Sequence, residues 1–144
     1  MEKTDVGLVE SLRTVHASLL EDLRKLGEAV KARSGEGPAE LAARLTETHA
    51  HLTEHFRFEE ENGYMDTVRE REPRLERAIE HLAEEHRQLK ESLEMLLTEA
   101  RIARAMEAAF RTRVREWVKR VRQHEVRENE LIEDAFNLDL GAED

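Results

Sequence analysis

Four histidines and two glutamates stand at positions where an amphipathic helix would bury its side chains. Two of the histidines are followed by a glutamate four residues later, and the complete set is His16, His55, Glu59, His86, His124 and Glu128. A histidine and a glutamate four residues apart lie on the same face of a helix. Neutral imidazole nitrogens and carboxylate oxygens are common metal ligands. The six residues could therefore hold metal ions, provided that the fold brings them together.

The apolar residues around these positions recur at steps of three and four, which is the period of an α-helix and not of a strand. In the first of four such stretches, position 16 interrupts a stripe that runs from Leu12 to Val30. The other stripes occupy positions 41–59, 75–96 and 110–131, and the histidines and glutamates fill places where apolar residues are expected. We therefore expect four amphipathic helices that carry polar residues on their buried faces.

Glycine and proline mark two of the three connections between these helices. Residues 34–37, Ser-Gly-Glu-Gly, are a typical helix end, and Pro38 is a favourable first residue for the next helix. The second helix is expected to end near residues 62–63, Asn-Gly. Residues 64–72 then form a connection that can contain a short helical turn, and Pro73 opens the third helix. No glycine or proline marks the start of the fourth helix.

The spacing of the histidines places them in one layer of an antiparallel bundle. Residues of neighbouring antiparallel helices share a level when they are equally far from the turn between them. The midpoint of His16 and His55 falls between residues 35 and 36, inside the first turn. The midpoint of His55 and His86 falls between residues 70 and 71, just before Pro73, and that of His86 and His124 is residue 105.

Six polar groups in one buried layer need a common partner, because burying a polar group without one costs a few kcal/mol and burying a charge costs more. Metal cations provide such a partner. Four histidines and two carboxylates are too many for one ion, so a pair of metal ions is the preferred interpretation. The alternative is a metal-free helical-bundle interaction module, in which the buried polar layer only fixes the register of the helices.

Length and composition agree with this architecture and exclude several functions. The 144 residues predict one all-α, up-and-down four-helix bundle at residues 1–136, followed by a C-terminal tail at 137–144. The 33 acidic residues exceed the 23 basic ones, so no nucleic-acid partner is expected. The absence of cysteine excludes disulfides and iron–sulfur ligation. With neither a signal peptide nor an apolar run of about 18–20 residues, we expect a cytoplasmic protein without membrane contact.

The complete set resembles the hemerythrin-like, or HHE cation-binding, family. The resemblance is clearest from His55 through Glu60 to Tyr64 and in the Glu85-His86 pair, and it extends over about residues 8–135. It implies a four-helix bundle around a non-haem di-iron centre. On this basis the terminal iron ligands are His16, His55, His86 and His124, and the bridging ligands are Glu59 and Glu128.

Two departures from the oxygen-carrying members of the family bear on function. Those members have a further histidine one turn before the third-helix ligand, where this chain has Leu82. They also place a carboxylate five residues after the fourth-helix histidine, whereas Glu128 follows His124 by four. The set is closer to iron-centre-repair proteins and to an iron-sensing hemerythrin domain. It implies a protein that handles or senses iron, oxygen, peroxide or nitric oxide, more than a dedicated enzyme; manganese and zinc also accept these ligands.

The remaining polar residues near the stripes are given lesser roles. His51, His81 and Tyr64 are candidates for supporting the ligands from outside, and His51 is the strongest because it lies one turn before a ligand. Glu60 and Glu85 each adjoin a ligand in the sequence, which points them sideways, so a surface position is expected. No partner protein is indicated.

Overall fold

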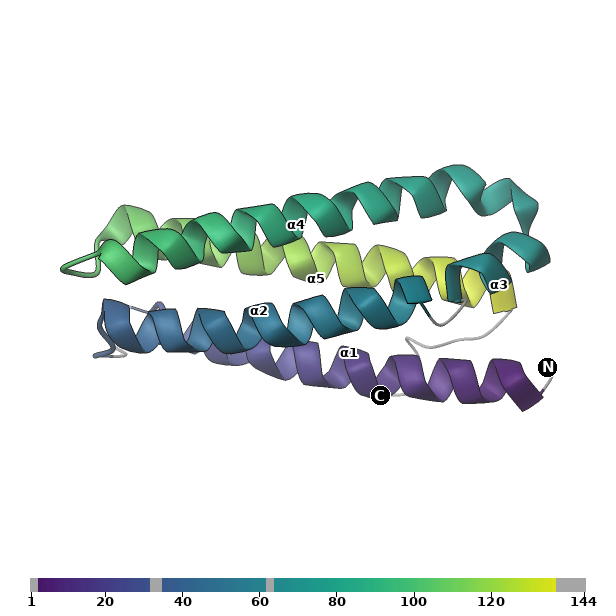
Figure 1. Ribbon diagram of the computed structural model, residues 1–144, viewed down its shortest axis with the longest axis horizontal. Helices are drawn as coiled ribbons and strands as arrows, with labels where there is room; N and C mark the ends of the chain where they lie inside the picture. Colours follow the sequence, from purple (N-terminus) through teal and green to yellow (C-terminus); the bar gives the residue numbers. More distant parts are fainter. Residues whose placement is uncertain (1–2, 32–34, 62–63, 137–144) are drawn as a thin grey trace.

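The computed structural model describes residues 3–31, 35–61 and 64–136. Within them five α-helices follow one another: α1 (Lys3–Ala29), α2 (Pro38–Glu61), α3 (Tyr64–Arg71), α4 (Glu76–Ile102) and α5 (Ala108–Phe136). A 3₁₀ turn, Pro73–Leu75, precedes α4, and no strand occurs in the described ranges. The four long helices run up and down beside one another (Figure 1). The predicted all-α, up-and-down bundle is therefore confirmed.

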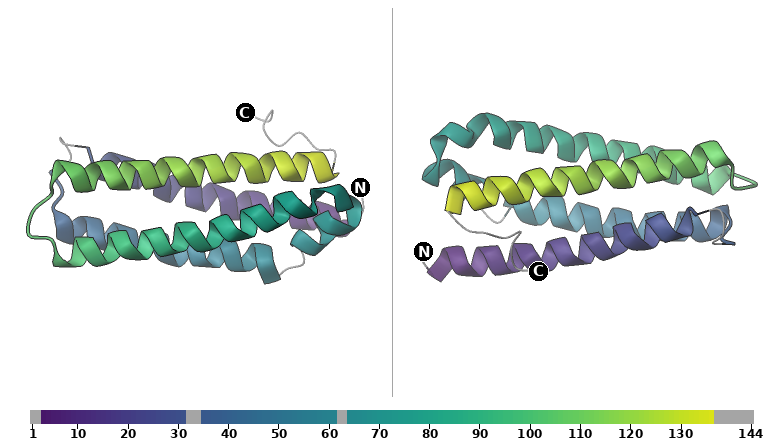
Figure 2. Two further views of the ribbon diagram at one scale, coloured as in Figure 1. Left: turned by 90° about the horizontal axis from the view of Figure 1, so that it is seen from above. Right: turned by 180° about the vertical axis from the view of Figure 1, so that it is seen from behind.

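The long helices form a closed ring in which each packs against two others. α1 contacts α2 and α5, and α4 contacts α2 and α5. The α1–α2 and α4–α5 connections lie at one end of the bundle, and α3 lies at the other end (Figures 1 and 2). The predicted connection at residues 64–72 is thus largely helical, and it buries Met65 and Val68. The tail predicted at 137–144 lies outside the described residues.

The helix ends follow the signals in the sequence where the structure describes them. Gly35 has a φ of +74°, a conformation that glycine adopts without the steric penalty of a side chain. Pro38 is the first residue of α2, and the backbone N–H of Gly37 donates a hydrogen bond to Glu40 Oε2 at 2.7 Å. α5 begins at Ala108 without a glycine or proline, which is why its start was not marked in the sequence.

The four predicted stripes are the buried faces of α1, α2, α4 and α5. Every described position of the stripes at 41–59, 75–96 and 110–131 is buried, as are His16, Leu19, Leu23 and Leu26 of the first stripe. The side chain of Leu12 lies outside the described part of the structure. Helical periodicity alone therefore identified the core-facing positions.

The buried polar layer separates two hydrophobic clusters. The larger cluster fills the bundle towards the α1–α2 and α4–α5 connections, and it includes Leu23, Leu45, Leu93 and Val121. The smaller one joins α3 to the adjoining ends of α4 and α5: Met65, Val68, Leu75, Ile79, Leu82, Leu131, Ile132 and Ala135. Apolar packing on both sides keeps water away from the layer and makes unpaired charge there costly.

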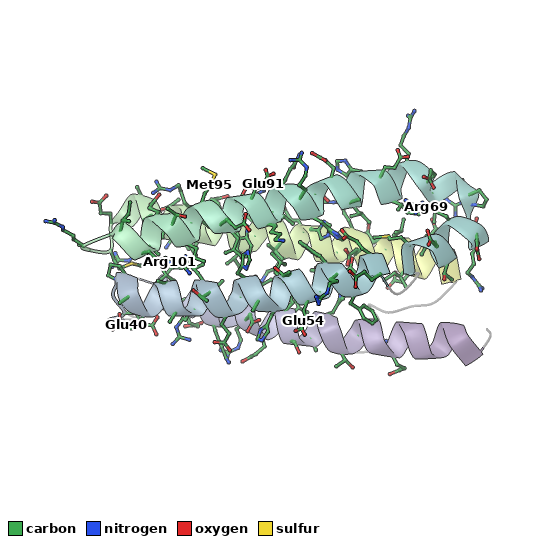
Figure 3. All side chains as sticks on the ribbon, viewed as in Figure 1. Glu40, Glu54, Arg69, Glu91, Met95 and Arg101 are labelled. Atoms are coloured by element: carbon green, nitrogen blue, oxygen red, sulfur yellow. The ribbon has the colours of Figure 1, made fainter. Side chains whose placement is uncertain are left out.

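Charged side chains cover the outside of the bundle. Glu40, Glu54, Glu91 and Arg101 are exposed and project from the helices in Figure 3. Within the described ranges, none of the helices combines the length and the apolar character that a bilayer crossing requires.

Candidate metal centre

The six candidate ligands come from all four long helices and meet in the middle of the bundle. All are buried, and the exposed fraction is 0% for His55, Glu59, His124 and Glu128. The imidazoles form two pairs: the ring centroids of His16 and His55 are 4.8 Å apart, and those of His86 and His124 are also 4.8 Å apart. The layer of histidines predicted from the turn positions is present in the structure.

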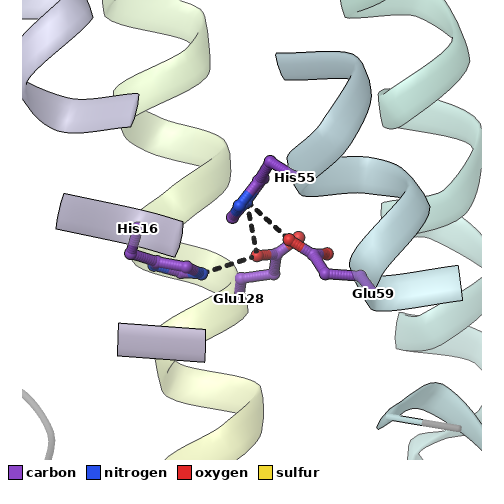
Figure 4. A group of neighbouring side chains, drawn as sticks. All are labelled: His16, His55, Glu59 and Glu128. Carbon is purple, nitrogen blue, oxygen red and sulfur yellow. Dashed lines mark ion pairs between the residues drawn. The ribbon is translucent and has the colours of Figure 1, made fainter. Parts of the chain in front are cut away.

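Glu128 lies between the two histidine pairs, and each of its carboxylate oxygens faces a different pair. Oε1 lies 3.2 Å from His16 Nε2 and 3.7 Å from His55 Nε2. Dashed lines mark these two ion pairs in Figure 4. Oε2 lies 3.0 Å from His86 Nε2 and 2.9 Å from His124 Nε2. A single carboxylate on α5 therefore contacts all four imidazoles.

Glu59 of α2, across the bundle from α5, also directs its two carboxylate oxygens to different histidine pairs. Its Oε1 lies 2.5 Å from His55 Nε2 and its Oε2 lies 3.2 Å from His86 Nε2. Both glutamates thus place one oxygen towards each histidine pair, and the Nε2 atoms of all four histidines face these carboxylates. Two carboxylates placed in this way can bridge a pair of cations.

The opposite ring nitrogens of two histidines face further carboxylates. His124 Nδ1 lies 3.0 Å from Glu85 Oε1, and the other oxygen of Glu85 pairs with Arg127. His86 Nδ1 lies 3.5 Å from Glu60 Oε1. The predicted surface position is confirmed for Glu60, which is exposed, but it is wrong for Glu85, whose side chain is only 20% exposed. Glu85 precedes His86 on α4 and faces α5, the helix against which α4 packs on this side.

Glu125 is a buried member of the cluster that sequence reasoning missed. It is 3% exposed, with Oε2 2.9 Å from His16 Nδ1 and Oε1 3.1 Å from His55 Nε2. The periodicity did not identify Glu125 because this residue follows position 124 of the predicted stripe and is not itself a stripe position. A second stripe on α5 carried the signal: Val118 and Ile132, seven residues before and after it, are both buried.

Two of the three residues predicted to support the ligands from outside, His51 and His81, lie away from the six candidate ligands. His51 Nδ1 contacts Asp22 Oδ2 on α1, and the described structure joins it to none of the six candidate ligands. His51 precedes the buried Leu52 and lies at the edge of the α2 stripe, where its ring faces α1 and not the layer. His81 is exposed on α4. The side chain of Tyr64 lies outside the described part of the structure.

The four buried histidines have a high affinity for protons. Burial lowers the pKa of each, but contacts with the buried carboxylates outweigh it. The pKa is raised to about 9 for His16, about 12 for His55 and about 10 for His86, and it is also raised for His124. The layer is therefore a site that attracts positive charge.

The three buried glutamates divide into two kinds. Burial and the neighbouring Glu128 raise the pKa of Glu59 to about 7. Burial also acts to raise the pKa of Glu125 and of Glu128. Contacts with the histidines outweigh this effect, so the pKa of both carboxyl groups lies below the usual value; in Glu128 the contact with Glu59 also lowers the pKa. Glu125 and Glu128 therefore provide negative charge at neutral pH.

Buried polar atoms without a hydrogen bond are concentrated in this cluster. Among the described residues, eight buried side-chain nitrogen or oxygen atoms form no hydrogen bond of suitable geometry, and six of them belong to His16, His55, Glu59, Glu125 and Glu128, although close ion-pair contacts reach several of these six. One imidazole N–H cannot satisfy several carboxylate oxygens, whereas a cation accepts electron pairs from all of them at once. The donor set therefore fits metal ions.

The donor atoms divide into two groups that share one residue. His16, His55, Glu59 and Glu128 each offer an atom within 4.8 Å of the others, and so do His86, His124 and Glu128. Comparison with known proteins agrees with this chemistry: a family model described as Hemerythrin HHE cation binding domain matches residues 7–136. No curated protein and no solved structure gives a significant match.

Proposed function

Because this chain belongs to the family of hemerythrin HHE cation-binding domains, we propose that its buried layer holds two non-haem iron ions and serves to handle or sense iron, oxygen, peroxide or nitric oxide. The observation that carries the proposal is the orientation of Glu128 and Glu59. Each directs one oxygen to one histidine pair and the other oxygen to the other pair. Carboxylates that span two sets of imidazoles suit two cations better than one.

Each ion would receive two imidazoles together with oxygens of the bridging carboxylates. His16 and His55 would hold one ion and His86 and His124 the other. Iron binds such mixed nitrogen and oxygen donors and retains positions for exogenous ligands. Leu82, one turn before His86, is buried in the smaller hydrophobic cluster and offers no donor atom. An iron pair held here supplies binding and redox chemistry towards small oxygen- and nitrogen-containing molecules.

The surrounding carboxylates would orient the imidazoles for metal binding. A histidine binds metal through the nitrogen without a proton, and a carboxylate that accepts a hydrogen bond from the other nitrogen selects this tautomer. Glu85 faces Nδ1 of His124 and Glu125 faces Nδ1 of His16. Both contacts leave Nε2 directed at the bridging carboxylates.

The direct test measures iron in protein that has been incubated anaerobically with ferrous iron and then desalted. We expect about two iron ions per chain in the wild type and about one or fewer after His124→Ala or Glu128→Ala. His81→Ala changes an exposed histidine of the same helix as His86 and should bind iron like the wild type. Circular dichroism confirms that the variants remain helical. Full iron occupancy in both ligand variants would refute the proposal.

The same samples separate iron from other metals and from a metal-free role. Parallel incubations with manganese and zinc show which metal the site retains, because availability as well as geometry decides selection. A metal-free interaction module would show the same thermal midpoint with and without chelator, since nothing would bind the native state preferentially. A midpoint that rises with metal supports the proposed centre.

A further inference from the structure

A second group of ligand-type side chains lies between α1 and α2, outside the buried layer. Asp22 of α1 contacts Nδ1 of His51 through its Oδ2, and Glu47 lies one turn before His51 on α2. These three residues each offer a donor atom within 4.8 Å of the others. None of the three is among the ligands of the centre proposed above.

Asp22 is the unusual member of the group, because an aspartate is seldom buried without compensation. It is 6% exposed, and among the described residues no lysine or arginine forms an ion pair with it. Arg44, one turn before Glu47, is occupied with Glu36, at 2.9 Å between Nε and Oε1. A buried carboxylate needs a positive partner. The partner is either a protonated imidazole or a cation shared with Glu47.

Local geometry favours a cation at this place. Glu47 and His51 are four residues apart and lie on one face of α2, so their donor groups are already directed to the same side. Asp22 adds a third donor from the helix that packs against this face. Glu47 is exposed and the side chain of His51 is 39% exposed, so an ion can arrive from solvent. The net charge of −10 attracts cations to the protein.

We propose that Asp22, Glu47 and His51 bind one divalent transition-metal cation, such as Zn²⁺, Mn²⁺ or Fe²⁺, at a site separate from the buried centre. One imidazole nitrogen and two carboxylate oxygens are its protein donors, and water completes the coordination. The buried layer holds its cations between two hydrophobic clusters. The site formed by Asp22, Glu47 and His51 is reached from solvent through the exposed Glu47 and exchanges its ion freely.

The test measures Co²⁺ binding to the full chain by equilibrium dialysis. We expect the wild type to bind about one more Co²⁺ per chain than His51→Ala. Glu47→Gln alters an exposed residue and cannot disturb the core, and it should weaken binding at this site about 10-fold or more. His49→Ala is the matched control, because His49 lies on the same helix and contacts Glu94 instead. It should bind as much Co²⁺ as the wild type.

Two further measurements identify the site. A paramagnetically shifted imidazole resonance should disappear in His51→Ala and remain in His49→Ala. In the Glu128→Ala background, the ion that depends on His51 should still bind, which separates this site from the buried centre. Equal Co²⁺ binding by His51→Ala, Glu47→Gln and His49→Ala would overturn the proposal and leave Asp22 and His51 as an ion pair only.

Discussion

Metal binding to the buried layer should release an unusually large number of protons. A metal ligand must be a neutral imidazole, so any proton that the metal-free histidine carries has to leave. The pKa values of His16, His55 and His86, at about 9, 12 and 10, lie well above neutral pH. These three histidines therefore carry protons at pH 7, and His124, whose pKa is also raised, contributes further.

The expected number follows from these values. Filling the centre at pH 7 should release about four protons per chain. Each imidazole with a pKa of 9 or more is almost fully protonated there, and Glu59, with a pKa of about 7, is about half protonated and must also lose its proton to bind metal. Four histidines with the ordinary pKa near 6.5 would release only about one in total, since each is about one-quarter protonated at pH 7. Apparent metal affinity should accordingly rise steeply with pH, because protons compete with the cation.

Isothermal titration calorimetry with Zn²⁺ measures this release directly. Zinc has no redox chemistry, so no oxidation adds or consumes protons. Titrations at pH 7 in buffers of different ionisation enthalpy give the number of protons from the slope of observed heat against buffer enthalpy. The His51→Ala variant serves as a control that removes the heat of binding to the separate site at Asp22, Glu47 and His51. Release of about one proton or fewer would refute the reasoning, because the carboxylates would then not hold protons on the imidazoles.

Other contacts of the cluster give three further expectations. The thermal midpoint of the metal-free protein should fall as the pH rises from about 6.5 to about 9, more than that of the metal-loaded protein. A histidine whose pKa is raised by folding adds stability that is fully present below the unfolded pKa near 6.5 and is lost as the pH rises through the folded pKa, about 9 for His16. Glu85→Gln should weaken metal binding about 10–100-fold by loosening the ring of His124, whereas Glu84→Gln, at an exposed neighbour, should not. Phe56→Ala should lower the free energy of unfolding in urea by about 3–5 kcal/mol, since the buried ring stacks on His86 with centroids 3.8 Å apart.

Each of these expectations has a clear contrary result. An equal fall of the thermal midpoint with and without metal between about pH 6.5 and 9 would show that the imidazoles carry no extra protons in the folded state. Equal metal affinities for Glu85→Gln and Glu84→Gln would show that His124 is held without the carboxylate. A loss below about 1 kcal/mol for Phe56→Ala would show that little apolar burial depends on this ring.

The sequence by itself determined the fold class and the composition of the buried layer. Helical period is a local property, so the stripes along α2, α4 and α5 could be read without knowing which helices are neighbours. The turn at Gly35 and Pro38 and the opening of the third helix at Pro73 then placed His16, His55 and His86 at one level. Antiparallel packing with short connections leaves little freedom in that register.

Only the tertiary structure decided which groups face one another across the helices. Glu125 and Glu85 lie beside the predicted stripes, and their contacts with His16 and His124 depend on the rotation of each helix about its axis. His51 illustrates the same point, because it lies one turn before His55 in the sequence and yet contacts Asp22 of α1 and not the buried centre. Helical periodicity predicts whether a side chain points into the core or along the edge of the buried face. The residue that this side chain contacts is decided by the packing of two helices that are distant in the sequence.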